Sequence, residues 1–309
     1  MGLASSRVEP PPVLEFGRAR VLMGRNGGKF PYGNSILVRG SEESLIIDPS
    51  KSLKYHSVDL AGVDRVLLSH CHQDHVAGVH LFPDSLCQAH PLELPAIQGI
   101  DGLLELHGVV DEEREQFSQN VRDYFNYTPR PDATAFEVER ELDLGRVKVQ
   151  FLHTPGHTHG HTCFIVRGEQ RRHELIFLAD IELTGFGPYY GGPNSSLVDF
   201  DRSLTEVRQL DLAWFVTYHH IGVLDQPAFR ARAAQYHGMI AQREAKLLDY
   251  LSEPHTLEEA VAHRIVYRPA DTGHHTDRNE RNMLRQHLDR LLEQERVVEV
   301  APGRYQRRS

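Results

Sequence analysis

The segment His70-Cys71-His72-Gln73-Asp74-His75 places three imidazoles and one carboxylate within six residues. It directly follows the apolar run of residues 66–68, which is typical of a β-strand. Imidazole nitrogen and carboxylate oxygen are ligands that zinc and similar metals accept. Because desolvated polar groups without partners are costly, so dense a cluster indicates a shared positive partner. The segment therefore predicts a metal site at the end of a strand.

Three further places carry a metal-type ligand just after an apolar stretch. They are His157 in a Thr-Pro-Gly-His-Thr turn, Asp180 after residues 174–178, and the pair His219 and His220 after residues 214–217. Strand ends at one edge of a sheet lie close together in space. The pattern therefore predicts that all four places contribute to one site.

The elements that would position these groups follow from short apolar runs and turn residues. The pattern predicts strands at residues 19–25, 35–39, 44–48, 64–69, 147–152, 163–166, 174–178 and 214–217. It predicts helices at residues 76–82, 111–125 and 197–210. Strands come first and then alternate with helices, which indicates an α/β layered architecture.

With these motifs the sequence resembles the metallo-β-lactamase superfamily over residues 19–225. The His-x-His-x-Asp-His segment, the His157 turn, the strand-end Asp180 and the late histidine occur in the order known in that family. They are most similar to its glyoxalase II-type hydrolase branch. The resemblance implies an αββα sandwich with a metal centre between the edges of its two sheets.

The resemblance also implies two divalent metal ions, with zinc favoured and iron or manganese as alternatives, and a hydroxide bridging them. The implied ligands are His70, His72 and His157 for the first ion, Asp74, His75 and His219 for the second, and Asp180 between them. An aspartate bridge suits two metals about 3.5–4 Å apart. The β-lactam hydrolases of the superfamily usually lack this carboxylate, so the resemblance argues against an antibiotic hydrolase.

The last ligand is open between two neighbours. Counting forward from the end of the strand at residues 214–217 favours His219. Aligning Gly-Val-Leu at residues 222–224 with the turn usual in the resembled family favours His220. We expect His219 to be the ligand.

Three nearby residues are expected to support the site rather than to bind metal, and a fourth is expected to take no part in it. His159 and His161 could hold a third metal, but bracing the loop through hydrogen bonds is the favoured interpretation, because metal ligands commonly need such partners. Asp48, at the end of its own strand, is expected to do the same. Cys71 alternates with its histidine neighbours and is expected to be a buried bystander.

Two glycine-hinged loops with aromatic residues, 27–34 and 185–192, are expected to shape a substrate pocket. Tyr189 and Tyr190 are the candidate substrate-binding residues. Lactonase-like relatives carry a tyrosine three residues after the bridging aspartate, where this chain has Leu183, which argues against a lactonase. A clear basic cluster for the carboxylates of glutathione is also missing from the sequence, so glyoxalase II activity itself is not implied.

The pattern divides the chain into an extended lead-in at residues 1–18, a catalytic domain at 19–237 and a winged-helix-like domain at 238–309. The last part would hold three amphipathic helices, at 239–251, 257–266 and 280–294, and a terminal hairpin. It carries 12 Lys and Arg against 12 Asp and Glu, whereas the net charge of the whole chain is −9. We expect this domain to cap the active site or to form the surface of a homodimer.

The whole sequence favours a metal-dependent hydrolase of a small ester, thioester or similar substrate. A nuclease with a winged helix is the main alternative, but the acidic balance argues against nucleic acid as a partner. An iron-dependent sulfur dioxygenase is a further alternative that the full two-metal ligand set disfavours. Three cysteines without a C-x-x-C pair indicate a reducing, cytoplasmic location, and no apolar run is long enough for a membrane span.

Overall fold

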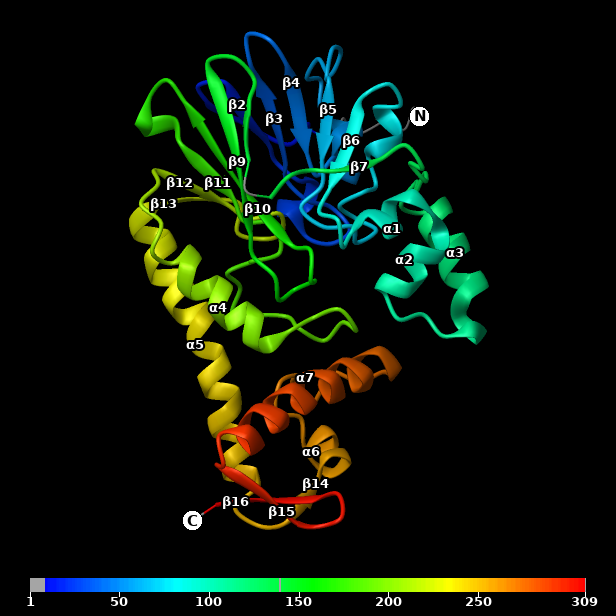
Figure 1. Ribbon diagram of the computed structural model, residues 1–309, viewed down its shortest axis with the longest axis vertical. Helices are drawn as coiled ribbons and strands as arrows, with labels where there is room; N and C mark the ends of the chain where they lie inside the picture. Colours follow the sequence, from blue (N-terminus) through cyan, green and yellow to red (C-terminus); the bar gives the residue numbers. More distant parts are fainter. Residues whose placement is uncertain (1–8, 139, 309) are drawn as a thin grey trace, which may run out of the picture.

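The computed structural model describes residues 9–138 and 140–308, and two β-sheets packed face to face form its centre (Figure 1). Helices cover the outer face of each sheet, and a smaller unit of helices and strands follows at the C-terminal end (Figure 1). This layering buries the apolar faces of both sheets and of the helices.

The first sheet contains seven strands in chain order. They are β1 (Val13–Phe16), β2 (Ala19–Leu22), β3 (Ser35–Arg39), β4 (Ser44–Ile47), β5 (Arg65–Leu67), β6 (Leu86–Ala89) and β7 (Thr134–Ala135). Strands β1 to β4 pair antiparallel, and β4 to β7 pair parallel. The parallel pairing directs the ends of β4 and β5 to the same edge, where Asp48 and the His70 segment follow.

The second sheet contains six strands in the order β13-β12-β11-β10-β9-β8. They are β8 (Glu141–Asp143), β9 (Val147–His153), β10 (Thr162–Gly168), β11 (Leu175–Phe177), β12 (Trp214–Val216) and β13 (Val223–Asp225). Only β11 and β12 pair parallel, with Phe177 opposite Val216. Their common direction brings the following Asp180 and His219 to one edge of this sheet.

The alternation of side chains along each strand separates three apolar layers. Ile36 and Val38 of β3 face the second sheet, where they join Phe151 and Phe164 in the central core. Leu37 of β3 points the opposite way, into the layer beneath the outer helices. Because neighbouring residues of a strand point to opposite faces, one strand contributes to both layers.

The outer helices bury one face each against their sheet. The first sheet is covered by α1 (Leu94–Gln98), α2 (Ile100–Leu106) and α3 (Arg114–Asp123), and the second by α4 (Leu197–Val207) and α5 (Gln226–Tyr250). Side-chain oxygens cap the first turn of the two helices on the second sheet. Ser196 accepts a hydrogen bond from the Asp199 N–H at the start of α4, and Asp225 accepts one from the Ala228 N–H at the start of α5. Such caps satisfy backbone donors that a helix start leaves free. The described part also contains five 3₁₀ turns: η1 (Arg25–Gly28), η2 (Lys51–Tyr55), η3 (Val79–Leu81), η4 (Asp111–Glu113) and η5 (Arg171–His173).

The C-terminal unit is built on the far end of α5. It contains β14 (His255–Thr256), α6 (Leu257–His263), α7 (His274–Glu293), β15 (Val297–Ala301) and β16 (Arg304–Arg307), with its strands in the order β14-β16-β15. Figure 1 shows α7 crossing below the sandwich toward α2 and α3. The expected boundary at 237/238 falls inside α5, which is one continuous helix.

Several expected elements differ from the structure. The helix expected at residues 76–82 is only the 3₁₀ turn η3, because Gly78 packs on Pro49 and donates its N–H to the Pro49 carbonyl. Part of the expected lead-in, residues 13–16, is strand β1; residues 1–8 lie outside the described part. In the described part, no helix combines the length and apolar character needed to cross a membrane.

Candidate metal centre

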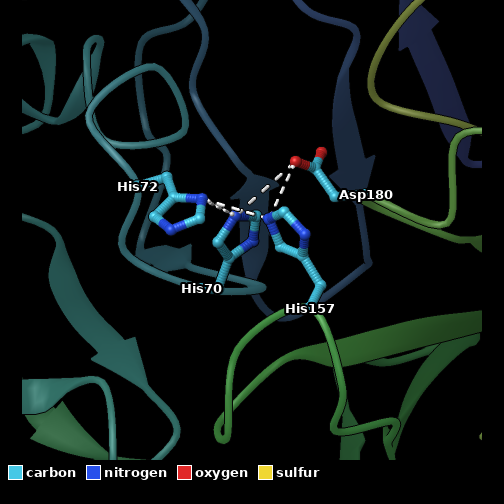
Figure 2. A group of neighbouring side chains, drawn as sticks. All are labelled: His70, His72, His157 and Asp180. Atoms are coloured by element: carbon cyan, nitrogen blue, oxygen red, sulfur yellow. Dashed lines mark hydrogen bonds and ion pairs between the residues drawn. The ribbon is translucent and has the colours of Figure 1, made fainter. Parts of the chain in front are cut away.

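Three histidines from two loops form the first cluster at the sheet edge. His70 and His72 follow β5, and His157 lies in the turn between β9 and β10. The His72 Nδ1 atom lies 3.1 Å from His70 Nε2 and 3.1 Å from His157 Nε2. Figure 2 shows the ring nitrogens directed toward one another and toward Asp180.

The second cluster contains Asp74, His75 and His219, whose ligand atoms lie within 4.8 Å of one another. His219 Nε2 is 2.8 Å from Asp74 Oδ2. His75 Nε2 lies 4.0 Å from the same oxygen. His75 and Asp74 come from the bend after His72, whereas His219 follows β12.

Asp180 connects the two clusters through its two carboxylate oxygens. Its Oδ2 lies 3.1 Å from His157 Nε2, and its Oδ1 lies 3.1 Å from His75 Nε2. One side chain thus offers one oxygen to each cluster, which is the arrangement expected of a bridging ligand.

The donor set fits metal binding. The 3.1 Å nitrogen separations of the first cluster are close to the edge of a zinc tetrahedron, roughly 3.3 Å for zinc–nitrogen bonds of about 2.0–2.1 Å. Burial, aided by neighbouring histidines, lowers the pKa of His70 and of His72 well below the usual value. Both rings are therefore neutral, and neutral imidazole is the form that ligates metals.

The second cluster attracts positive charge. Burial disfavours a charged His219, but its hydrogen bond to Asp74 and the nearby Asp180 raise the pKa of His219 to about 9. Against the same burial, Asp180 and Asp48 raise the pKa of His75 well above its usual value. The carboxylates on this side thus stabilise a cation, and together the two clusters are consistent with a binuclear metal site.

Hydrogen bonds on the outer ring nitrogens direct the inner nitrogens to the centre. His75 Nδ1 donates to Asp48 Oδ2 over 2.7 Å, as expected for Asp48. His219 Nδ1 lies 2.8 Å from the Gly28 carbonyl oxygen, and His157 Nδ1 lies 3.2 Å from that of Tyr189. A donor bond on one nitrogen sets the tautomer and leaves the other nitrogen free as a ligand.

Of the remaining residues near the site, one contacts it and two do not. His161 is buried, and its Nε2 accepts the Asp180 backbone N–H over 3.2 Å, so it braces the site as expected. His159 is exposed; only its backbone carbonyl takes part, bonded to His153. Cys71 is fully buried, burial raises the pKa of its thiol well above the usual value, and its sulfur belongs to neither cluster.

Of the two candidates for the last ligand, His219 is the one in the cluster. His220 has a φ of 59°, is exposed, and lines the cavity without belonging to either cluster. The left-handed backbone at His220 directs its side chain differently from that of His219.

Glu93 supports the site in a way that the sequence did not indicate. This carboxylate, 1% exposed, accepts hydrogen bonds from the Cys71 N–H (2.9 Å), the Thr158 hydroxyl (2.6 Å) and the Gly160 N–H (3.1 Å). It thereby ties the His70 segment to the His157 turn. No local pattern around Glu93 could have revealed a role that depends on two distant loops.

Side chains of the centre line a cavity of about 1000 Å³. Aromatic side chains from both expected loops line it, including Phe30, Phe186 and Tyr189. His107, which was not predicted, stacks on His72 with ring centroids 4.8 Å apart. Part of the wall comes from the C-terminal unit, in line with the expectation that this domain caps the site. The individual residues were not predicted: they include Tyr267, Arg278, Asn279 and Asn282.

Tyr190 does not line this cavity, unlike its expected partner Tyr189. It is 0% exposed, and its hydroxyl lies 2.6 Å from His287 Nε2 and 2.9 Å from Arg243 Nη1. Its role is therefore to hold the loop to α5 and α7 rather than to contact a substrate.

Comparisons with known proteins agree with this fold. The family model described as "Metallo-beta-lactamase superfamily" matches residues 28–220. A metallo-beta-lactamase family protein of known structure from Thermus thermophilus aligns with a TM-score of 0.68 at 22% identity, over 94% of this chain and 99% of that one. The expected α/β sandwich fold is confirmed.

Two curated relatives illustrate the diversity of similar proteins. An atrochrysone carboxyl ACP thioesterase from Passalora fulva is 28% identical over 225 residues, covering 67% of this chain and 56% of that protein. A hydroxyacylglutathione hydrolase from Francisella philomiragia subsp. philomiragia is 24% identical over 181 residues, 54% of each chain. This chain spans about half the length of the curated relatives it matches. The family match and the shared fold show that the chain belongs to the metallo-beta-lactamase superfamily.

Proposed function

We propose that the protein is a metal-dependent hydrolase of small acyl thioesters. In this proposal His70, His72 and His157 hold one divalent ion, Asp74, His75 and His219 hold a second, and Asp180 bridges them. Zinc suits the imidazole-rich first cluster, and iron or manganese remain alternatives. When bound, such ions lower the pKa of water toward neutrality and polarise the scissile carbonyl.

The observation that carries the proposal is the division of Asp180 between the clusters. Each of its oxygens lies 3.1 Å from a histidine nitrogen of a different cluster. A site built for one ion would have no use for a carboxylate shared in this way, whereas hydrolysis at a two-metal centre uses it to hold both ions together.

Two features of the chain support the proposal: the cavity lining suits an acyl group, and the cysteines offer no competing nucleophile. The aromatic walls of the cavity provide apolar contact for an acyl group. The three cysteines are all buried, and burial raises the pKa of the Cys87 and Cys163 thiols to about 12, so these residues do not offer a thiolate nucleophile. The two curated relatives are named for thioester-cleaving activities, which favours a thioester over the simple ester that the sequence also allowed.

The C-terminal unit supports a role in enclosing the substrate. Its element order, from the end of α5 through β14, α6, α7, β15 and β16, resembles a winged helix. Residues of α7 line the cavity, and the 12 basic and 12 acidic residues of 238–309 leave no excess charge for a phosphate backbone. We therefore favour a role for the C-terminal unit as a wall of the cavity over a role as a nuclease module. Its outer face is a separate candidate for a homodimer surface.

The test is a panel of acyl-CoA and acyl-glutathione thioesters, with release of free thiol as the readout and a nitrophenyl oxoester and an RNA as comparison substrates. We expect thioester turnover that a chelator abolishes. Asp180→Asn, which keeps the size of the side chain, is expected to lower kcat/KM by more than about 100-fold, beyond the usual effect of an outer partner. The matched variant Asp143→Asn, at an exposed position of β8, is expected to change it by less than about twofold.

Two results would contradict the proposal. One is a protein that holds two metal equivalents and cleaves no thioester of the panel. The other is full turnover and full metal content in Asp180→Asn, which would exclude the bridged centre.

A further inference from the structure

Glu182 is a carboxylate of the cavity wall that none of the expected ligand sets includes. It follows the bridging Asp180 by two residues, in the segment after β11. Its carboxylate forms a third group with Asp180 and His219, whose ligand atoms all lie within 4.8 Å of one another. It therefore lies on the His219 side of the centre.

The backbone around Glu182 directs its side chain to the cavity. Ile181 and Leu183 are 0% and 2% exposed and belong to the apolar layer beneath the outer helices. Asp180 and Glu182 alternate with them and both line the cavity. Burial of the two apolar residues beneath the outer helices leaves both carboxylates facing the cavity.

The surroundings of Glu182 differ from those of the other carboxylates near the centre. Asp48 accepts hydrogen bonds from His75 and Ser69, and Glu93 accepts three, so their oxygens are occupied. Within residues 9–138 and 140–308, no side chain forms a hydrogen bond or ion pair with the Glu182 carboxylate. The Glu182 carboxylate lines the cavity and is available to a cation there.

We propose that Glu182 is an additional carboxylate ligand on the His219 side and that it gives this side a preference for Mn²⁺ or Fe²⁺ over Zn²⁺. His219 belongs to two groups, one with Asp74 and His75 and one with Asp180 and Glu182, so carboxylates outnumber histidines around it, whereas the other side has three histidines and Asp180. Carboxylate oxygens suit harder ions such as Mn²⁺, and imidazoles suit Zn²⁺. The two sides of the centre thus prefer different metals. The inference rests on the metal-binding part of the proposed function but not on its substrate.

The test measures metal binding without any substrate. Metal-free protein is titrated with Mn²⁺ and, separately, with Zn²⁺ in competition with a chelating indicator, and the bound ions are counted by elemental analysis. Glu182→Gln removes the charge at the same size, Glu182→Asp keeps a shorter carboxylate, and Glu169→Gln is the matched control at an exposed position.

We expect two Mn²⁺ ions per chain in the unchanged protein and in Glu169→Gln. In Glu182→Gln the affinity for the second Mn²⁺ is expected to fall at least about tenfold, with a smaller loss for Zn²⁺, and Glu182→Asp should recover part of it. Circular dichroism of each variant establishes that the fold is retained.

Two outcomes overturn the inference. Unchanged Mn²⁺ and Zn²⁺ affinities in Glu182→Gln exclude a ligand role. Equal losses for both metals exclude the preference. If Glu182 governs Mn²⁺ binding but the thioester panel is inert, the substrate class is wrong and this inference stands.

Discussion

At the scale of single residues, His219 and His220 show how a one-residue difference decides a role. His219 contacts Asp74 through Nε2 and the carbonyls of Gly28 and Tyr32 through Nδ1, over 2.8 to 2.9 Å. His220 has a left-handed backbone and an exposed ring. Two adjacent imidazoles of the same chemistry thus face different surroundings.

This contrast makes a testable pair of variants. His219→Ala is expected to lower the affinity for the second metal ion by more than about 100-fold, because it removes a group that contacts the centre. His220→Ala, the matched control, should change that affinity by less than about twofold. Metal content after dialysis and competition with a chelator measure both. Equal losses in the two variants would show that the site does not distinguish these residues as the structure does.

The residues of the two clusters could be predicted because each follows an apolar strand or lies in the dense His70 segment. Strand ends meet at a sheet edge in any fold of this type, so their meeting needs no knowledge of the loops. Glu93 and His107 could not be predicted in this way. Their positions depend on how the helices after β6 pack on the His70 segment and the His157 turn. The role of Tyr190 likewise depends on Arg243 of α5 and His287 of α7, which lie 53 and 97 residues further along the chain.

At the scale of elements, α7 and the loop after β11 are joined by polar contacts. Asn282 Nδ2 donates to the Gly191 carbonyl over 2.8 Å, and Gln286 Nε2 donates to that of Tyr190 over 2.9 Å. The same loop presents the Tyr189 carbonyl, 3.2 Å from His157 Nδ1. The C-terminal helix therefore positions the loop that orients one histidine of the first cluster.

Tyr190→Phe tests this connection. The variant removes a buried hydroxyl and leaves His287 Nε2 without its partner, so we expect a loss of about 1–3 kcal/mol in the free energy of unfolding. Tyr189→Phe is the matched control: its ring faces the cavity, and we expect less than about 0.5 kcal/mol. Urea denaturation of the two metal-free proteins measures the difference. Equal stabilities would show that the Tyr190 hydroxyl does not hold the loop.

Strands were predicted more completely than the short helices of the structure. The strand expected at residues 35–39 is β3 with the same bounds, because its continuous apolar run is buried on both faces. Helices α1 and α2 have five and seven residues, too few to show a helical repeat of apolar positions. The short strands β6, β7 and β8 were missed for the same reason, since two to four residues carry little alternation.

At the scale of the whole molecule, burial keeps histidines neutral at several places. Burial lowers the pKa of His90 and of His107 to about 4 and that of His161 to about 3. In the unfolded chain each would titrate near its ordinary value of about 6.5. Between these values the unfolded chain binds protons at these three histidines that the folded protein does not. Their contribution to folding stability is therefore fully present above pH ~6.5 and is lost as the pH drops toward 4.

His90 allows this dependence to be measured away from the two clusters. Its ring is 7% exposed and stacks on His153 with centroids 4.4 Å apart, so a charge here is poorly solvated and faces a second imidazole. The shift corresponds to about 3 kcal/mol of stability lost between pH ~6.5 and 4. His90→Asn keeps an acceptor for the Leu92 N–H and removes the titrating group, so the stability of this variant should fall less over that pH interval.

The exposed His159→Asn serves as the control variant, and its stability should follow that of the unchanged protein. Urea denaturation of the metal-free proteins at pH 7 and pH 4.5 measures the loss of unfolding free energy for each variant. An equal loss in His90→Asn and in the control would show that His90 does not contribute to the loss of stability in acid.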